Sequence, residues 1–253
     1  LLGLASGCAT DRLWTPGRGE ILQRILPSSV QVVLEQDGRR FRTGSGVVIA
    51  ASPTAHGTEC FVITSGHTLA RLSGQETVYV LFGRQRGAGT KAVATVLAQR
   101  DTEDLDLALL RARSDTCVPA RLGAPPALGD EIWVVAFPWG RNMTLAGGIV
   151  SQLNDAEATD RESASRLMVD ASVSYGASGG GVYEARHGSL IGLVEGYRTA
   201  RVSFKGDATS RYIDVPVPGE TYVIPLADIW RFLALADQTR LVAGRPALAP
   251  PKR

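Results

Sequence analysis

A serine, a histidine and an aspartate in this sequence have the types and surroundings that nucleophilic catalysis requires. Ser178 lies in the stretch "SVSYGASGGGVYE", within a Gly-x-Ser-Gly-Gly pattern. A serine hydroxyl becomes a nucleophile when a base takes its proton, a carboxylate orients that base and N–H donors meet the developing oxyanion. The stretch alone leaves a second interpretation open, because glycine- and serine-rich turns also join strands without any catalytic role.

The base must come from one of three histidines. His56 and His187 lie in stretches typical of loops and turns, whereas His67 closes the apolar run "CFVITSGH" at the end of an expected strand. His67 is therefore the candidate base. A hydrogen-bonded structural histidine is the alternative interpretation.

The orienting carboxylate is expected in "DTEDLDLALLRAR", at Asp104 or Asp106. Leu105, Leu107 and Leu109 alternate with Asp106, as in a strand that has two different faces. A carboxylate inside such an apolar strand is costly unless it is paired. This favours Asp106, and a solvent-facing edge position is the alternative.

Short strands separated by turns must position these three residues. "VQVVLEQDGRRFRTGSGVVIA" predicts a hairpin around Asp37-Gly38, and further strand-like runs follow at short intervals. The proline-rich stretch "TCVPARLGAPPALGDE" indicates a linker, after which the strands resume. Residues 226–235 carry one apolar face at helical spacing. The pattern predicts an all-β fold of the barrel or sandwich class, with a helix near the end.

Five blocks along the chain carry a family resemblance. They are "TGSGVVI…FVITSGHTL", "DLDLALL", "GDEIWVVAFPWG…AGGIVS", "VDASVSYGASGGG" and "TYVIPLADI". In this order they resemble the successive blocks of the bacterial HtrA-type (Deg-type) trypsin-like serine proteases, from about residue 27 to residue 235. The resemblance implies two six-stranded antiparallel β-barrels over residues 28–118 and 119–235, with a short C-terminal helix and a disordered tail over residues 236–253.

The resemblance also assigns roles. His67 is then the general base, Asp106 the residue that holds its tautomer, and Ser178 the nucleophile that forms an acyl-enzyme. The N–H groups of Gly176 and Ser178 form the oxyanion hole. Substrates are proteins or peptides, and no cofactor or metal is implied.

The substrate pocket follows from the same alignment. Ser172 occupies its floor, and a neutral floor predicts small or medium uncharged side chains at the cleavage position. Tyr175, Val194, Glu195 and Gly196 form the walls, although Glu195 could attract a basic residue instead.

The sequence departs from the family pattern at several places. Ala177 replaces the aspartate that pairs with a new N-terminus in digestive trypsins, and Gly181 takes a place usually held by proline. We expect that change to loosen the turn after Ser178. No PDZ domain is expected after the protease domain. Residues 198–220 are interpreted as a surface hairpin in preference to a regulatory loop.

The three cysteines suggest a compartment. "LLGLASGC" resembles the end of a bacterial lipoprotein signal, with Cys8 as the lipidated residue and an outer-membrane location favoured. A free Cys8 in an apolar N-terminal segment is the alternative. Residues 9–27 are then a tether ending in a short helix. Cys60 and Cys117 remain as a candidate disulfide or as two buried thiols.

Composition excludes some function classes. The net charge is +2 and no Lys/Arg run occurs, which disfavours nucleic-acid binding, and no apolar run reaches the roughly 18 to 20 residues of a membrane span. We therefore expect an endopeptidase that acts on unfolded or secreted proteins in the cell envelope. The competing hypotheses are a catalytically silent protease-fold lipoprotein that binds a partner protein, and a protease dedicated to one partner.

Overall fold

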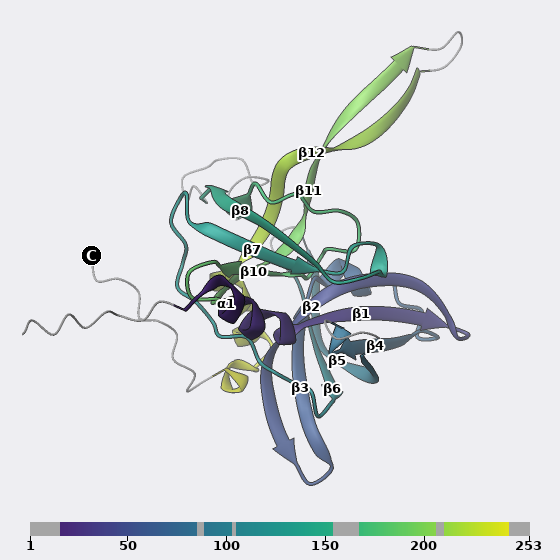
Figure 1. Cartoon of the computed structure of the whole chain (residues 1–253). Helices are drawn as coiled ribbons and strands as arrows, with labels where there is room; N and C mark the ends of the chain where they lie inside the picture. The colour runs from purple at the N-terminus through teal and green to yellow at the C-terminus, as the bar shows by residue number, and fades with distance from the viewer. Residues whose placement is uncertain (1–15, 85–88, 103–104, 154–166, 206–209, 243–253) are drawn as a thin grey trace, which may run out of the picture.

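Two closed antiparallel β-barrels make up most of the structure, a computed structural model that describes residues 16–84, 89–102, 105–153, 167–205 and 210–242 (Figure 1). The first barrel has the strand order β1-β2-β3-β6-β5-β4. Its strands are β1 (Ser29–Gln36), β2 (Arg39–Thr54), β3 (Gly57–Thr64), β4 (Thr77–Phe82), β5 (Thr90–Thr102) and β6 (Leu105–Arg113). The predicted all-β fold with two six-stranded barrels is confirmed.

The second barrel repeats the same design with the order β10-β11-β12-β9-β8-β7. Its strands are β7 (Glu131–Ala136), β8 (Thr144–Gln152), β9 (Leu167–Val169), β10 (Gly181–Glu184), β11 (Leu190–Lys205) and β12 (Ser210–Pro225). The predicted linker joins the barrels between β6 and β7, and Leu122 within it bridges to Leu190 at the start of β11.

The first hairpin shows how local sequence sets the register. Asp37 and Gly38 join β1 to β2 with φ angles of 50° and 72°. Two successive residues with positive φ give the turn whose twist matches that of the flanking strands, and Asp-Gly is one of the pairs that adopt it most easily. The hairpin predicted around Asp37-Gly38 is therefore present.

Both faces of the central strands are buried, each in a different apolar cluster. Val48 of β2 and Val62 of β3 lie in the core of the first barrel, whereas Val47 and Ile63 lie in a cluster shared with residues of the second barrel, including Leu193. Because side chains alternate across a strand, one face fills its barrel and the other joins the two barrels. The strands that precede or contain the candidate site residues, β3 and β6, contribute side chains to this shared core.

Helices close the ends of the described chain. The predicted N-terminal helix is α1 (Arg18–Ile25), which buries Ile21 and Ile25, and the short 3-10 turn η1 (Leu26–Ser28) follows it. The predicted C-terminal helix is α2 (Leu226–Leu235). None of the helices in the described ranges is long and apolar enough to cross a membrane.

The prediction of a disordered tail from residue 236 is wrong for residues 236–242. A 3-10 turn, η5 (Thr239–Leu241), follows α2, and Val242 is buried in the shared core. Val242 packs against residues that are distant in sequence, and the local sequence does not reveal such a contact. The rest of the predicted tail, residues 243–253, lies outside the described residues.

Gly181 has a packing role that its sequence context does not reveal. It lies within β10, paired with Val135 of β7 and Leu193 of β11, and does not form a loose turn. A Cβ at this position would lie 2.5 Å from the ring of Tyr183, whose fully buried hydroxyl contacts Ser28 at 2.9 Å. The missing side chain at 181 therefore makes room for the tyrosine.

Candidate active site

His67 lies in the short 3-10 turn η2 (Gly66–Leu69), which is separated from the end of β3 by Ser65 alone. A Cβ on the preceding Gly66 would overlap the carbonyl oxygen of Arg100 in β5. Only glycine allows the chain to pass this close to β5. The turn therefore holds His67 against the strands β5 and β6.

Asp106, the second residue of β6, binds His67 twice. The His67 backbone N–H donates to Asp106 Oδ1 at 2.6 Å, and His67 Nδ1 lies 2.6 Å from Asp106 Oδ2. Because an ionised carboxylate only accepts, Nδ1–H is the donor, and the lone pair of Nε2 is left for another partner. The structure brings these two predicted residues together in the geometry that a catalytic base needs. Asp104 lies outside the described residues.

The surroundings of His67 shift its pKa in opposing directions. Partial burial disfavours the imidazolium and lowers the pKa. The hydrogen bond and negative charge of Asp106 outweigh this, with smaller contributions from Asp101 and Glu195, so that the pKa lies above the ordinary value of 6.5. The site is thus built to stabilise a protonated histidine.

The segment before Ser178 forms a tight turn. The N–H of Ala177 donates to the carbonyl oxygen of Ser174 at 3.0 Å, and Gly176 has a φ of 89°. A Cβ on Gly176 would lie 2.9 Å from the backbone nitrogen of Trp139. Both the positive φ and the close approach explain why glycine is needed here.

The backbone donors on either side of Ala177 have no acceptor among the described residues. Within the part of the chain that the structure describes, neither the N–H of Gly176 nor that of Ser178 makes a hydrogen bond, although their neighbours Ala177 and Gly179 do. Gly176 is buried. Unpaired donors beside a candidate nucleophile are what an oxyanion hole requires.

The first barrel holds the Ser178 turn close to the start of η2. The carbonyl oxygen of Ser178 accepts from the N–H of Ser45 at 2.8 Å. A Cβ on Gly179 would lie 2.5 Å from Thr64 Oγ1 and 3.0 Å from the nitrogen of Ser65, two residues before His67. Among the described residues, no hydrogen bond yet joins Ser178 to His67.

Ser45 is a site residue that sequence reasoning missed. Its hydroxyl donates to the carbonyl oxygen of Gly176 at 2.9 Å and accepts from the N–H of Phe137 at 2.8 Å. It is 1% exposed and lies in β2, so it links the first barrel to two loops of the second. Its signal was the small, polar "TGSG" run at the start of an apolar strand, where a buried hydroxyl needs partners.

The loop that contains Trp139 packs against the Ser178 turn. The N–H of Trp139 donates to the carbonyl oxygen of Tyr175 at 2.7 Å, and their rings lie 5.5 Å apart. Trp139 has a φ of 56°, a conformation that costs free energy for a residue other than glycine. Gln31 Nε2 from the first barrel donates to the carbonyl oxygen of Gly140 at 2.8 Å and helps to hold this loop.

The predicted pocket residues lie along one edge of the site. Ser172 and Tyr175 are exposed, Val194 is buried, and Glu195 and Gly196 are partly exposed. The carbonyl oxygen of Val194 accepts from the N–H of Gly179 at 2.7 Å, so β11 runs beside the Ser178 turn. Their roles in specificity remain a prediction.

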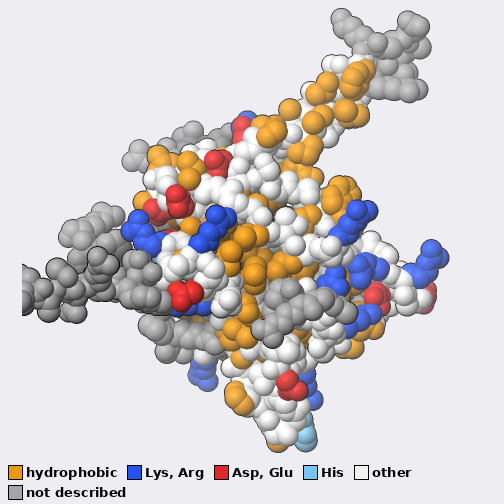
Figure 2. All heavy atoms as spheres, viewed as in Figure 1, with side chains coloured by type: hydrophobic (Ala, Val, Ile, Leu, Met, Phe, Trp, Pro, Cys, Tyr) orange, Lys and Arg blue, Asp and Glu red, His pale blue; other side chains and the backbone are white. Residues whose placement is uncertain are grey.

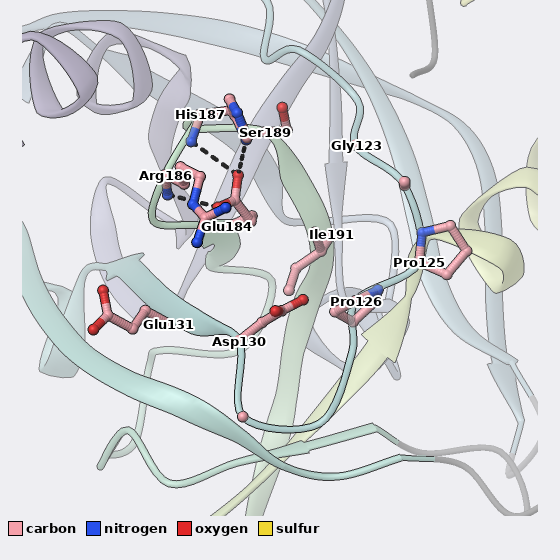
Figure 3. Close-up of a pocket in the computed structure, with 12 residues that line it drawn as sticks. Gly123, Pro125, Pro126, Asp130, Glu131, Glu184, Arg186, His187, Ser189 and Ile191 are labelled. Carbon is pink, nitrogen blue, oxygen red and sulfur yellow. Dashed lines mark hydrogen bonds and ion pairs between the residues drawn. The ribbon is translucent and has the colours of Figure 1, made fainter. Parts of the chain in front are cut away.

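A separate cavity of about 550 Å³ lies on the second barrel (Figure 3). The linker residues Pro125 and Pro126 line it together with Glu184, whose carboxylate accepts from the backbone N–H groups of Arg186 and His187. None of the predicted site residues lines this cavity. No cluster of three metal-ligating side chains occurs in the described ranges.

The cysteines fall into two groups. Cys60 and Cys117 form a disulfide, with their Cα atoms 5.9 Å apart. Cys8, the predicted lipidation site, lies outside the described residues.

A family model places this architecture among known proteins. The model of the trypsin-like peptidase domain matches residues 44–193, which include His67, Asp106 and Ser178. The chain belongs to this family. The match begins within β2 of the first barrel and continues as far as the first residues of β11.

Individual proteins that are similar to this chain support the HtrA resemblance. "Protease Do-like 2, chloroplastic" of Arabidopsis thaliana is 28% identical over 195 residues, covering 74% of this chain and 29% of that protein. "Serine protease HtrA-like" of Staphylococcus haemolyticus is 29% identical over 162 residues, covering 60% of this chain and 24% of that protein. The chain thus spans less than a third of the length of these relatives.

A solved structure of Deg5 has the same fold. It superposes with a TM-score of 0.64 at 20% sequence identity, covering 91% of this chain and 96% of the Deg5 chain. The predicted resemblance to HtrA-type trypsin-like proteases is confirmed.

Replacing Asp106 with Asn should lower the pKa of His67. The hydrogen-bonded charge that raises the pKa would be gone, while the burial that lowers it would remain. NMR titration of the imidazole protons measures this, with His67 assigned by its loss in His67→Ala. Asp101→Asn is the matched control and should give a smaller decrease, because Asp101 acts on His67 by its charge alone. Equal shifts in both variants would contradict the assignment.

The raised pKa of His67 also makes the stability of the protein depend on pH. A pKa raised in the folded state stabilises the protein below the unfolded pKa of 6.5, and this contribution disappears as the pH rises through the folded pKa. Asp106→Asn should therefore lower the stability more at acidic than at alkaline pH.

Ser45→Ala should destabilise the protein by about 1–3 kcal/mol, because it leaves the buried Gly176 carbonyl and Phe137 N–H without their partner. We also expect kcat to fall by about tenfold with little change in KM, since a loosened turn misplaces the N–H groups of the predicted oxyanion hole. Denaturant unfolding and peptidase kinetics measure the two effects. Ser52→Ala, an exposed position on the same strand, is the control. If Ser45→Ala loses stability but keeps its kcat, Ser45 has a structural role only, and the predicted effect on catalysis is wrong.

Proposed function

We propose that the protein is a serine endopeptidase that hydrolyses peptide bonds in unfolded or secreted proteins, with His67, Asp106 and Ser178 as its catalytic triad. The observation that carries the proposal is the doubly bonded Asp106–His67 pair, which lies close in the chain to the residues that hold the Ser178 turn. Membership of the trypsin-like peptidase family supports it.

In this proposal the reaction proceeds by acyl transfer to Ser178. Ser178 Oγ attacks the peptide carbonyl carbon while its proton passes to His67 Nε2. The oxyanion is stabilised by the two unpaired N–H groups of Gly176 and Ser178. His67 then protonates the departing amine, the acyl-enzyme forms, and a water molecule activated by His67 hydrolyses it. Asp106 stabilises the imidazolium formed in each step.

The missing Ser178–His67 hydrogen bond is compatible with this reaction, because catalytic hydrogen bonds in unliganded sites often close only when substrate binds. The same observation favours the competing hypothesis of a silent protease fold that binds a partner protein. The two hypotheses differ in whether the hydroxyl of Ser178 is reactive.

A fluorophosphonate probe tests this reactivity, since it labels only an activated serine. We expect rapid labelling of the wild type at Ser178 and a loss of at least a thousandfold in rate in both Ser178→Ala and His67→Ala. Ser151→Ala, an exposed serine on β8, is the matched control and should label like the wild type. A folded wild-type protein that resists the probe would contradict the proposal and support the silent binding protein.

We further propose that the protein acts in the cell envelope, anchored through a lipid on Cys8. The disulfide between Cys60 and Cys117 supports an oxidising compartment. The sequence Ala5-Ser6-Gly7-Cys8 supports lipidation.

Metabolic labelling with an alkyne fatty acid tests the anchor in a bacterial host. Label and membrane association are expected for the wild type, and both should be lost in Cys8→Ser and retained in Cys117→Ser. Lipid label that persists in Cys8→Ser would contradict the assignment of that cysteine.

A further inference from the structure

The end of the β11–β12 hairpin leaves the second barrel and projects from the molecule (Figure 1). Seven residue pairs hold it together, from Thr199–Pro216 to Lys205–Ser210. A two-stranded ribbon is at best marginally stable by itself, so an extended one usually has something to pack against. Residues 200–204 and 212–215 of this projecting part are named here the ribbon.

The two faces of the ribbon differ in character. Directly paired residues share a face, so Ala200 and Val215 lie on the same side as Val202 and Ile213. Phe204, two residues beyond Val202, lies on that side as well. Val202, Phe204 and Ile213 are 42%, 52% and 53% exposed. Figure 2 shows hydrophobic side chains along this projection.

The opposite face carries a charged pair whose members contact each other. Arg201 forms an ion pair with Asp214 at 2.9 Å, and its guanidinium lies 4.4 Å from the centre of the Tyr212 ring. The apolar face has no such partners among the described residues. It is the face that gains from being covered.

The ribbon is continuous with the candidate active site. Strand β11 passes the Ser178 turn at Val194, whose carbonyl oxygen accepts from Gly179 N–H and Ser65 Oγ, and it runs without interruption to residue 205. On one side β12 pairs with it from Gly192 to Lys205, with register shifts after Val194 and after Tyr197. On the other side β10 pairs only as far as Leu193. In the described chain, no strand therefore covers that second edge over residues 199–205.

From this continuity we propose that the ribbon is an extended exosite for the substrate polypeptide itself. It binds an apolar, unfolded segment on the amino side of the scissile bond. An added strand running antiparallel to β11, with its carboxyl end at Ser178, carries its amino-terminal residues outward along the uncovered edge. Alternate side chains of that strand then lie on the apolar face.

The length of the edge sets the length of the segment. The uncovered edge of β11 over residues 199–205 extends about 23 Å at about 3.3 Å per residue, so it accommodates about seven substrate residues. The proposal rests on the peptidase function proposed above. It adds to that function a site on the ribbon that binds an extended apolar segment of the substrate.

Two quenched fluorescent peptides test the exosite. The short one has four residues before the cleaved bond, and the long one adds seven residues of alternating Val and Ser before them. We expect kcat/KM of the wild type to be at least tenfold higher for the long peptide. N-methylation of alternate amides in the added residues should remove this advantage without any change in the protein, because it blocks strand pairing.

Protein variants provide the second arm. The triple variant Val202→Thr, Phe204→Thr, Ile213→Thr keeps β-forming residues but removes the apolar face, and the long-to-short ratio should fall to near one. The double variant Ser203→Thr, Tyr212→Thr changes the opposite face and should retain the ratio.

Other outcomes overturn the exosite. A long-to-short ratio of kcat/KM near one in the wild type contradicts it. A triple variant that keeps the ratio also contradicts it. If that variant instead loses self-association in sedimentation, or loses binding to vesicles of anionic phospholipid, the apolar face serves that contact and does not bind substrate. If the wild type cleaves neither peptide, the proposed function fails separately. Binding of the fluorescein-labelled long peptide to Ser178→Ala is then measured as a separate test of the exosite. If the peptide does not bind, the exosite proposal is wrong.

Discussion

One buried hydroxyl holds the two halves of the candidate site together. Ser45 projects from the first barrel and joins the carbonyl oxygen of Gly176 to the N–H of Phe137, both in the second. In a low-dielectric interior, losing either bond leaves a polar group unsatisfied, so the position of the Ser178 turn is fixed relative to β2. His67 follows β3, the neighbour of β2, and thereby shares the same frame. The geometry between the barrels thus depends on polar contacts at the site as well as on the apolar core beneath it.

The structural features that depend only on neighbouring residues in the sequence could be predicted. Asp37-Gly38 predicted its hairpin, because the backbone angles of the turn favour that pair. His67 and Asp106 stood out because each interrupts or ends an apolar strand, where a polar group needs a partner. The family resemblance then supplied the two-barrel topology, which strand patterns alone left open between a barrel and a sandwich.

Features that depend on contacts distant in sequence could not be predicted. The absence of a side chain at Gly181 has a reason only when the ring of Tyr183 is in place, and the burial of Val242 depends on a core formed by other segments. Ser45 looked like one small residue among several, since its two partners lie about 90 and 130 residues away. The unpaired N–H groups of Gly176 and Ser178 are visible only once the acceptors of their neighbours Ala177 and Gly179 are known.

The disulfide has a consequence for how the first barrel forms. Cys60 and Cys117 are separated by 57 positions, and both His67 and Asp106 lie between them, whereas Ser178 does not. The base and its carboxylate therefore belong to one covalent ring, which remains closed when the chain unfolds. Closing a loop of this size removes conformational entropy from the unfolded chain worth about 4 kcal/mol in the simplest treatment. The encounter of His67 with Asp106 is thus a search within a ring, while Ser178 must be brought to them from an open chain.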